Sequence, residues 1–348
     1  MVWPILSTVY EINPLRDERW ETFLDNHRLA SIFHSAQWLA SLQKTYGCQA
    51  AAVTTDPPGK PLTNAVVYCR VRSWATGPRL VSLPFSDHCS PLVESLEQLD
   101  GLLSGLKRAC DSGAERHLEV RSGAIRSHAM ADSASFCWRR LDLRPSLDDL
   151  RRGFHESCIR RKITRAQKEG LTYEEGVSEE LLREFYGLTV LTRQRHQMAP
   201  QPLSWFRNLL ASMGDRAKIR LARHRGQPAA AILTLRSNRA MTYKYGASDA
   251  RFHSLGPMQL LFWRAIQEAK NNGLSEFDMG RTDWDNPGLL TFKDRWGTGR
   301  TTLTYLRYPA VSAQAAATFL KRMSKVIFRM TPTSLLPAAG SLLYRHFD

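Results

Sequence analysis

The sequence predicts an α/β protein made of two similar units in tandem, each with a mixed, mostly antiparallel sheet covered by helices. The chain has 348 residues, which is too long for one ordinary domain and about right for two. Its residues are 43% hydrophobic and 23% charged, a composition typical of a globular chain with a sizeable core. The order of expected strands and helices in the second half also recurs in the first.

The second half shows its elements most clearly. Leu181, Phe185 and Leu188 recur at helical spacing, while short turns separate three strand-like runs as in antiparallel neighbours. Pro257 fits the first turn of a helix and Gly273 its C-terminal end. The expected order is strand, two helices, three strands, helix, strand, helix and strand, over residues 170–176, 178–196, 203–213, 217–224, 228–236, 240–248, 256–273, 275–280, 289–296 and 300–308.

The first half reads in nearly the same order, although Pro and Gly blur its boundaries. The expected elements are a strand, two helices, three strands, a helix and two strands, over residues 7–12, 16–25, 35–45, 49–55, 64–72, 79–83, 95–110, 116–122 and 136–143. We therefore expect a duplicated unit joined near residues 144–153. The predicted domains are 1–148 and 149–309, with the main site in the second, followed by a tail over 310–348.

The charge balance is strongly basic. Forty-eight Lys and Arg against 33 Asp and Glu give a net charge of +15, which attracts polyanions such as nucleic acid, phosphorylated donors or an anionic membrane face. A solvated basic surface is the alternative for each cluster. The first cluster comprises Arg151, Arg152, Arg160, Arg161, Lys162, Arg165 and Lys168.

Several protein classes are not expected. No stretch approaches the roughly 18–20 apolar residues of a membrane-spanning helix, and the first 20 residues lack the features of a secretory signal, so we expect a cytoplasmic protein. The cysteines form no CxxC pair and the histidines show no metal-ligand spacing, which favours reduced thiols and no metal site. The six cysteines are Cys48, Cys69, Cys89, Cys110, Cys137 and Cys158.

A loop that enters a helix is the first candidate site. A strand ends at Ser248, a polar loop carries Arg251 and His253, and Gly256-Pro257 opens the next helix. Free N–H groups and the positive end of the helix dipole favour phosphate at such a start, so Ser248, Arg251, Gly256 and Pro257 are predicted to bind an acyl donor. A plain Gly-Pro helix start is the alternative.

The segment 277–297 is dense in polar groups around a buried strand. Asp278 and Arg281 flank Gly280 at the strand end, where open α/β sheets hold ligands, and Lys293 lies on the short helix that follows. A partly desolvated lysine can neutralise a phosphate or an oxyanion. The alternatives are a structural Asp278–Arg281 ion pair and a surface lysine with a buried stem.

Other polar candidates are more scattered. Asp87 and His88 lie in a loop after an expected strand, and Trp38 lies on an early helix. These residues are candidates for substrate binding, with a local turn cap and core packing as alternatives. Arg195 ends a helix, where positive charge is favourable in any case.

An ordered set of motifs resembles Fem-like acyltransferases, which include peptidoglycan aminoacyltransferases and relatives in exopolysaccharide systems of Gram-negative bacteria. The resemblance covers roughly residues 30 to 308. Its motifs are Phe33-His34-Ser35-Ala36-Gln37-Trp38, Leu83-Pro84 with Asp87, Arg160-Arg161-Lys162, Tyr243-Lys244-Tyr245-Gly246-Ala247-Ser248, Gly256-Pro257, Glu276-Phe277-Asp278-Met279-Gly280-Arg281 and Phe292-Lys293-Asp294-Arg295-Trp296-Gly297.

The resemblance implies two tandem GNAT-type folds and acyl transfer to an amine of a cell-envelope or exopolysaccharide precursor. The donor is then an acyl-CoA or an aminoacyl-tRNA, used as a substrate, with no permanently bound cofactor. Lys293 occupies the place of a functional lysine in the peptidoglycan enzymes, and Tyr245 that of a tyrosine whose hydroxyl lies in the substrate cleft. The long helical arm of some Gram-positive members is absent, which argues against peptidoglycan bridge formation with charged tRNA.

A direct attack of the amine requires no nucleophilic side chain. In this mechanism Lys293 stabilises developing negative charge, Tyr245 donates a proton or orients the carbonyl, and Asp278 accepts or positions the amine. Arg281 and Arg195 hold acidic groups of the acceptor, and Tyr243 adds to substrate binding. We expect Tyr245, Asp278 and Lys293 to line one pocket with the 256–257 turn. A nucleic-acid-binding protein and a non-catalytic scaffold at the membrane are the alternatives.

The tail is expected to form a basic amphipathic helix. Phe319, Met323 and Ile327 share one side, with basic residues mostly on others. Such a helix favours peripheral contact with the inner face of the cytoplasmic membrane, or packing on its own domain. The predicted partners are therefore a small-molecule or lipid-linked glycan substrate, tRNA as a donor, and the membrane surface.

Overall fold

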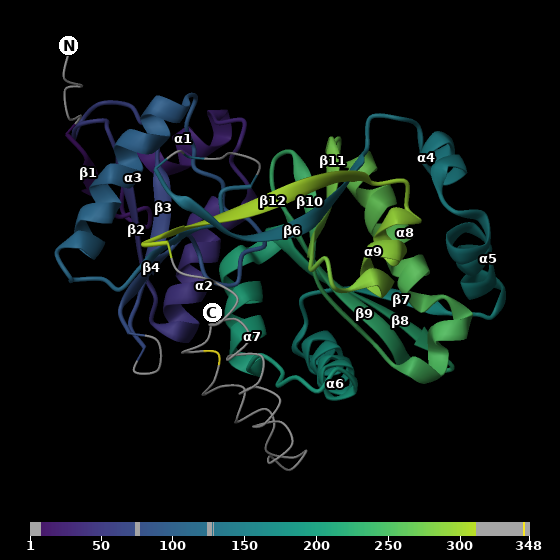
Figure 1. Ribbon diagram of the computed structural model, residues 1–348. Coiled ribbons are helices and arrows are strands. Elements are labelled where there is room, and N and C mark those ends of the chain that lie inside the picture. Colours follow the sequence, from purple (N-terminus) through teal and green to yellow (C-terminus); the bar gives the residue numbers. More distant parts are fainter. Residues whose placement is uncertain (1–7, 74–76, 124–126, 128, 311–343, 345–348) are drawn as a thin grey trace. The chain divides into compact units, whose positions relative to one another are not determined.

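The computed structural model describes residues 8–73, 77–123, 127, 129–310 and 344 (Figure 1). These residues form two compact units. Unit 1 contains the described residues up to Phe136, those from Thr302 to residue 310, and Tyr344; unit 2 contains Cys137–Thr301. The amphipathic helix expected in the tail lies outside the described residues.

Unit 2 has a six-stranded sheet in the order β6-β11-β10-β9-β8-β7. Only β10 and β11 pair in parallel, and the other neighbours are antiparallel. Its elements are β6 (Ala131–Asp142), α4 (Leu147–Gly153), a π-helical turn η2 (Glu156–Arg160), α5 (Arg161–Lys168), β7 (Thr172–Gly176), α6 (Glu179–Arg195), α7 (Leu203–Met213), η3 (Gly214–Arg216), β8 (Ala217–His224), β9 (Gln227–Arg236), β10 (Ala240–Ser248), η4 (Ala250–Leu255), α8 (Pro257–Asn271), β11 (Glu276–Thr282) and α9 (Pro287–Asp294).

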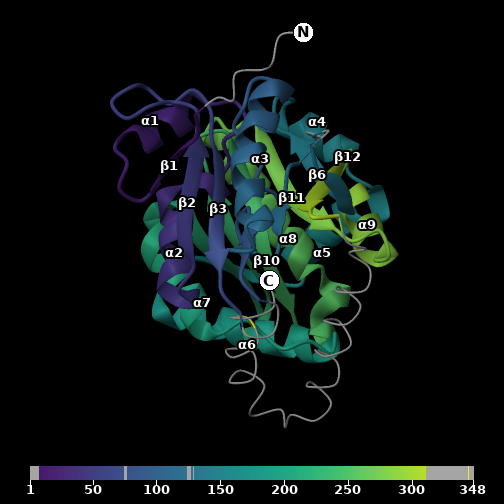
Figure 2. The same cartoon turned by 60° about the vertical axis from the view of Figure 1, so that its left-hand side comes forward.

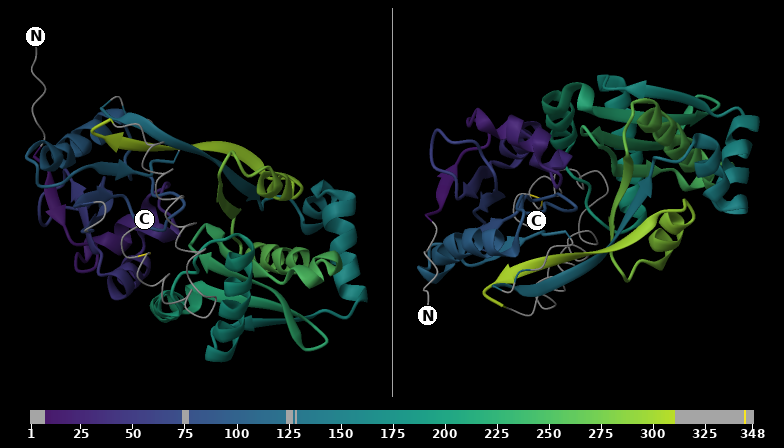
Figure 3. Two further views of the ribbon diagram at one scale, coloured as in Figure 1. Left: turned by 60° about the horizontal axis from the view of Figure 1, so that its bottom comes forward. Right: turned by 90° about the horizontal axis from the view of Figure 1, so that it is seen from above.

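Helices cover both faces of this sheet (Figures 1 and 3). Ala230 and Ile232 of β9 belong to the hydrophobic cluster that α8 fills. The intervening residues Ala231 and Leu233 are also fully buried, so they face the opposite side, where α6 lies against β9 and β10. A strand buried on both faces reads as a continuous apolar run, as β9 does.

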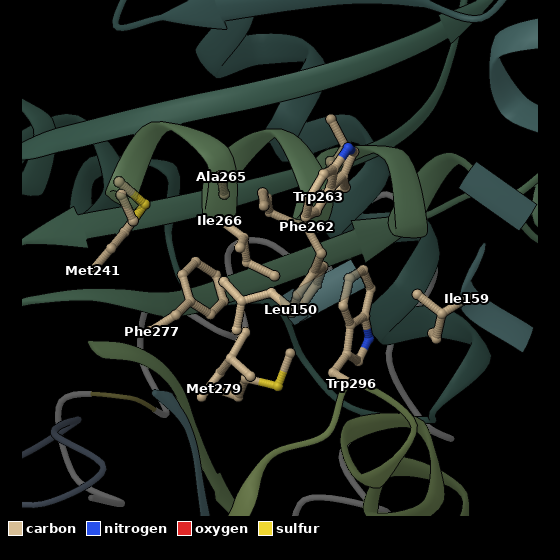
Figure 4. Packing of buried hydrophobic residues seen from close by; sticks show 14 of the residues in the cluster. Leu150, Ile159, Met241, Phe262, Trp263, Ala265, Ile266, Phe277, Met279 and Trp296 are labelled. Atoms are coloured by element: carbon tan, nitrogen blue, oxygen red, sulfur yellow. The ribbon is translucent and has the colours of Figure 1, made fainter. Parts of the chain in front are cut away.

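Aromatic packing fixes the end of α9 to the core of unit 2 (Figure 4). Trp296, which is fully buried just after α9, stacks on Phe262 of α8 with ring centroids 5.4 Å apart. Phe154 packs edge-on to the same indole at 5.0 Å. Contacts of this kind add about 0.5–1.5 kcal/mol each beyond the burial of their area.

Unit 1 has the sheet order β1-β2-β3-β4-β5-β12-β6, and α2 and α3 both lie against β2 (Figure 2). Leu99, Leu102 and Leu106 of α3 share one core cluster with β2 and β3. Its elements are β1 (Tyr10–Ile12), α1 (Arg19–Asn26), η1 (Ile32–His34), α2 (Ala36–Tyr46), β2 (Gln49–Thr54), β3 (Val66–Val71), β4 (Arg79–Val81), α3 (Leu96–Asp111), β5 (Leu118–Val120), the start of β6 and most of β12 (Gly299–Tyr308).

Two strands divide between the units. Residues 137–142 of β6 pair with β11 in unit 2, while Leu306–Tyr308 of β12 pair with β5 in unit 1. Each sheet thus includes a strand from the opposite half of the sequence. The sequence-based division at 148/149 gives two consecutive blocks, whereas the structural units interleave.

The expected fold class is confirmed, with most elements within a few residues of their predicted ends. No helices were predicted over residues 147–168, where α4, η2 and α5 lie. This segment is rich in arginine, and its buried apolar residues are few: Leu150, Phe154, Ile159, Ile163 and Ala166. In the described part of the chain, no helix combines the length and hydrophobicity that crossing a bilayer demands.

Candidate functional site

The parallel strands β10 and β11 separate partway along their length. Their pairing covers Ala240–Thr242 against Glu276–Asp278, although both strands continue further. Beyond Thr242, β10 stays paired with β9 through Ser248. The separation leaves β10 backbone groups facing an opening at the carboxyl ends of two parallel strands, where open α/β sheets bind ligands.

A β-bulge in β10 turns its two tyrosines to opposite faces of the sheet. Tyr243 pairs with Thr234 and Tyr245 with the adjacent Leu233, so Lys244 is the extra residue. Tyr243 packs on Phe262 of α8, with centroids 4.6 Å apart.

On the other face, the Tyr245 hydroxyl accepts a hydrogen bond of 2.9 Å from the indole N–H of Trp205 in α7. Tyr245 therefore lies on the face covered by α6 and α7, away from Tyr243. Without the bulge, the two side chains would have shared one face.

Gly246 is required by the position of Tyr243. A Cβ atom on Gly246 would lie 2.0 Å from the Tyr243 hydroxyl oxygen and 2.8 Å from its Cζ. The tyrosine ring thus folds back over the bulge onto the glycine. A larger residue at this position would displace the ring.

The start of α8 is shaped by a second glycine. Gly256 has φ +80°, and a Cβ atom there would lie 2.6 Å from the Lys162 carbonyl oxygen. Helix α5 contacts both η4 and α8, so this close approach brings α5 beside the helix N-terminus (Figure 3). Within the described residues, no side chain caps α8, whose first-turn N–H groups therefore stay available to an anion.

A cavity of about 490 Å³ lies between these elements. Its basic lining groups are Lys162, Arg195, Arg295, His196 and His253, and no Asp or Glu is among its lining residues. Each of three other surface cavities, of about 450–620 Å³, is lined by at least one acidic residue. The full lining is Lys162, Thr192, Arg195, His196, Tyr243, Gly246, Ala247, Ser248, His253, Pro257, Met258, Gln259, Leu289, Phe292 and Arg295.

Both imidazoles in this cavity have pKa values below the usual one. For His253, partial burial is the main cause, and the positive charges of Arg195 and Lys162 add to it. For His196, burial again leads, followed by Arg195 and Arg193. Both rings are therefore mostly neutral at pH 7. His253 Nε2 lies 2.9 Å from Ser248 Oγ.

The structure brings five of the predicted residues or their neighbours to this cavity. Arg195, Tyr243, Ser248 and Pro257 line it, and Gly256 directly precedes Pro257. Arg195 Nη1 also donates to the Ser248 carbonyl oxygen at 3.2 Å. Arg251, by contrast, is bound to the Asp249 carboxylate, with Nη2 2.6 Å from Oδ2, and is not a lining residue.

Asp278 and Lys293 do not line the cavity but lie in a buried polar cluster. Lys293 is 2% exposed, and its ammonium donates to the carbonyl oxygens of Gly280 and Arg281, each at 3.0 Å. Asp278 is 3% exposed and accepts from the Trp138 indole and the Gly280 N–H, each at 2.7 Å.

These four hydrogen bonds hold the irregular part of β11, where Gly280 has φ +69° and the register to β6 shifts. The expectation that Asp278, Lys293, Tyr245 and the 256–257 turn share one pocket is therefore wrong. The buried lysine satisfies backbone carbonyls that the separation of β11 from β10 leaves without a strand partner.

The predicted residues of unit 1 lie in or near its core. Trp38 is fully buried edge-on to Phe33 at 5.0 Å, and His88 packs on the same ring at 5.2 Å. The backbone carbonyl of Asp87 accepts a hydrogen bond of 2.7 Å from Tyr305. These contacts favour the structural alternatives for Trp38 and His88.

Sequence reasoning missed Lys162 and Arg295 as cavity residues, and it noted His253 only as part of the polar loop. Lys162 and Arg295 appeared in motifs of the family resemblance without a role in the site. The position of Lys162 depends on the packing of α5 against η4. Within the described residues, no three His, Cys, Asp or Glu side chains gather as a metal-binding group.

Comparison with known proteins agrees with this geometry. Residues 154–294, which include every lining residue of the cavity except Arg295, match the family described as "Acetyltransferase (GNAT) domain". This part of the chain is therefore similar to domains whose general reaction is acyl transfer. No curated protein matches the sequence significantly.

Several solved structures resemble the fold of most of this chain. FemX matches with a TM-score of 0.66 at 14% identity, over 89% of this chain and 99% of that one. The C-terminal domain of a putative lysylphosphatidylglycerol synthetase from Agrobacterium fabrum matches with 0.55 at 14%, over 90% and 96%. A tandem GNAT protein from the clavulanic acid biosynthesis pathway matches with 0.54 at 13%, over 87% and 99%. These similarities show that the chain shares the overall fold of FemX and of a tandem GNAT protein.

Proposed function

We propose that this protein is an N-acyltransferase that moves an acyl or aminoacyl group from a phosphate-bearing donor to an amino group of a cell-envelope or exopolysaccharide precursor. The observation that carries the proposal is the acid-free, basic cavity at the N-terminus of α8, beside the separated strands β10 and β11. Acyl-CoA and aminoacyl-tRNA both carry phosphates next to the transferable group, so both are donor candidates.

The donor phosphates bind at the α8 N-terminus. The first-turn N–H groups point outward from the helix, and Lys162 and Arg195 add positive charge at the same place. Gly256 lets the backbone of α5 at Lys162 approach the start of α8 closely, because no side chain stands between them. The acyl arm then runs along β10 past Ser248 and Gly246 towards Tyr243, into the opening between the two strands.

Transfer follows by direct attack of the acceptor nitrogen on the donor carbonyl carbon. The new C–N bond forms, the bond from carbon to the donor's sulfur or oxygen breaks, and the leaving group takes the electron pair. The nitrogen loses a proton to a base or water, and the leaving group is reprotonated. Backbone N–H groups that β10 no longer shares with β11 polarise the carbonyl, in the manner of an oxyanion hole.

The acceptor class rests on the relatives. The fold resembles FemX, in line with the Fem-like motifs of the sequence, and the C-terminal domain of a putative lysylphosphatidylglycerol synthetase, whose name contains that of a phospholipid. Arg281 and Asp278 remain candidates for selecting which acceptor binds, but only because they shape the end of β11. We place the protein in the cytoplasm, with peripheral membrane contact through the tail.

Acyl transfer can be tested with an acetyl-CoA and aminoacyl-tRNA panel against amino sugars and amino-bearing glycan precursors. The control is Arg195→Gln, which removes one basic group from the cavity. A product that forms with wild type and at least about 10-fold more slowly with the variant supports the proposal. Tight binding of any polyanion with equal affinity, unaffected by Arg195→Gln and without product, supports the nucleic-acid-binding alternative that the net charge of +15 favours.

A further inference from the structure

His253 lies between the strand end and the helix start that form the donor cavity. Its Nε2 atom is 2.9 Å from Ser248 Oγ, and its backbone carbonyl accepts a hydrogen bond of 3.1 Å from Lys162 Nζ. Arg195 is fixed at the same point through its bond to the Ser248 carbonyl. The imidazole, which η4 carries and a side chain of β10 contacts, thus lies near two permanent positive charges, from α5 and α6.

Positive groups outnumber negative ones around His253. Lys162, Arg195 and Arg295 are positive and line the cavity with the ring. The nearby carboxylate, Asp249, is buried and bound to Arg251, so that ion pair offsets most of its charge. In agreement with this arrangement, burial first and then Arg195 and Lys162 lower the pKa of His253, and Asp249 opposes them only in part.

We infer that His253 is a proton-linked ligand of the donor phosphate, which binds this group as an imidazolium so that donor binding takes up a proton. The inference rests on the proposed function, since it assigns His253 to the donor site. It concerns the phosphate and not the acyl group, so it applies equally to a CoA and to a tRNA donor.

An incoming phosphate changes the electrostatic potential at the His253 imidazole so that it favours a proton. Its negative charges offset Lys162 and Arg195, which removes the repulsion that keeps the imidazole neutral. The Ser248 hydroxyl can donate to the neutral ring or accept from the charged one, so this hydrogen bond survives protonation. In the imidazolium both ring nitrogens carry a proton, so Nε2 donates to Ser248 Oγ while Nδ1 donates to the phosphate.

A consequence follows for the pH dependence of catalysis. Donor affinity falls as pH rises through the range between the pKa values of free and donor-bound His253. The acceptor amine must be neutral to attack, which rising pH favours. The two requirements oppose each other, and a bell-shaped profile of kcat/KM for the donor results.

The test is isothermal titration of the full-length protein with coenzyme A, and separately with inorganic pyrophosphate, in buffers of different ionisation enthalpy at one pH near 7. The slope of the observed enthalpy against buffer ionisation enthalpy gives the number of protons taken up. Wild type is expected to take up a substantial fraction of one proton with both probes. His253→Gln keeps a polar side chain near Ser248 and is expected to abolish the uptake.

His196→Gln is the matched control, because His196 lines the same cavity and also has a lowered pKa. This variant is expected to keep the uptake. His253 is exposed, so its replacement should leave the fold intact, and circular dichroism of both variants checks this.

Binding by wild type without proton uptake, or uptake that persists in His253→Gln, overturns the inference while the donor site stands. Loss of the uptake in His196→Gln alone overturns it too. If neither coenzyme A nor pyrophosphate binds the wild type, both the inference and the proposed donor site fail.

Discussion

Replacement of Lys293 tests whether this residue supports the site or performs the chemistry. By resemblance, Lys293 would act on the reacting groups, and its loss would leave folding intact but slow turnover on the order of 10²-fold. The structure instead shows a buried ammonium with two backbone acceptors at 3.0 Å. We therefore expect Lys293→Met, which keeps most of the apolar stem, to destabilise unit 2.

The magnitude follows from the two carbonyls that lose their donor. Each buried acceptor without a partner costs about 1–3 kcal/mol, so the variant should lose about 2–6 kcal/mol of unfolding free energy. Urea unfolding, followed by circular dichroism, measures the loss. With a denaturant slope of about 2–3 kcal/mol/M, the midpoint should fall by about 0.7–3 M.

Lys270→Met is the matched control. Lys270 also donates to a backbone carbonyl, that of Arg144 at 3.1 Å, but this contact is exposed. Water replaces the lost donor there, so stability should change by less than about 0.5 kcal/mol. A Lys293→Met protein as stable as this control, with acyl transfer abolished, would refute the structural role and restore Lys293 to the reaction.

Three further substitutions test particular contacts. Gly246→Ala should displace Tyr243 and weaken binding of coenzyme A about 10-fold or more in a titration, and unchanged affinity would separate Tyr243 from the donor site. Gly256→Ala should lower the melting temperature, because φ is +80° and the new Cβ would lie 2.6 Å from the Lys162 carbonyl oxygen, at a cost of about 1–3 kcal/mol. A melting temperature equal to that of the wild type would contradict the described helix start. Burial alone would raise the pKa of Glu268, but hydrogen bonds and charges, led by Arg220, lower it to about 2. The ionised carboxylate therefore adds stability above about pH 4.5, and this stability is lost as pH falls towards 2. Glu268→Gln should destabilise the protein at pH 7 by about 3–5 kcal/mol and make its stability less dependent on pH in the acid range. A pH profile of stability equal to that of the wild type would contradict the pairing.

The elements of unit 2 after residue 170 were predictable because their signals are local, whereas the arginine-rich helices α4 and α5 were not predicted. The run of β9 and the spacing of Leu181, Phe185 and Leu188 depend only on neighbours in sequence. The Gly256-Pro257 start was predictable for the same reason.

The side-chain directions at the site were not predictable. The bulge at Lys244 reverses the face of Tyr245, and no local residue pattern marks the extra position. Likewise, Lys293 resembles a surface lysine in the sequence, because the two carbonyls that bury it belong to a strand 12 and 13 residues away. Such long-range contacts depend on topology, which the hydrophobic pattern does not encode.

The exchange of β6 and β12 has a consequence for synthesis on the ribosome. The nascent chain makes β12 after every other described strand, yet unit 1 needs Leu306–Tyr308 beside β5 to close its sheet. Until those residues emerge, β5 keeps an edge that can pair with another polypeptide. A fragment that starts at residue 149 would likewise lack the strand that borders β11, so neither half of the gene specifies a unit that is complete alone.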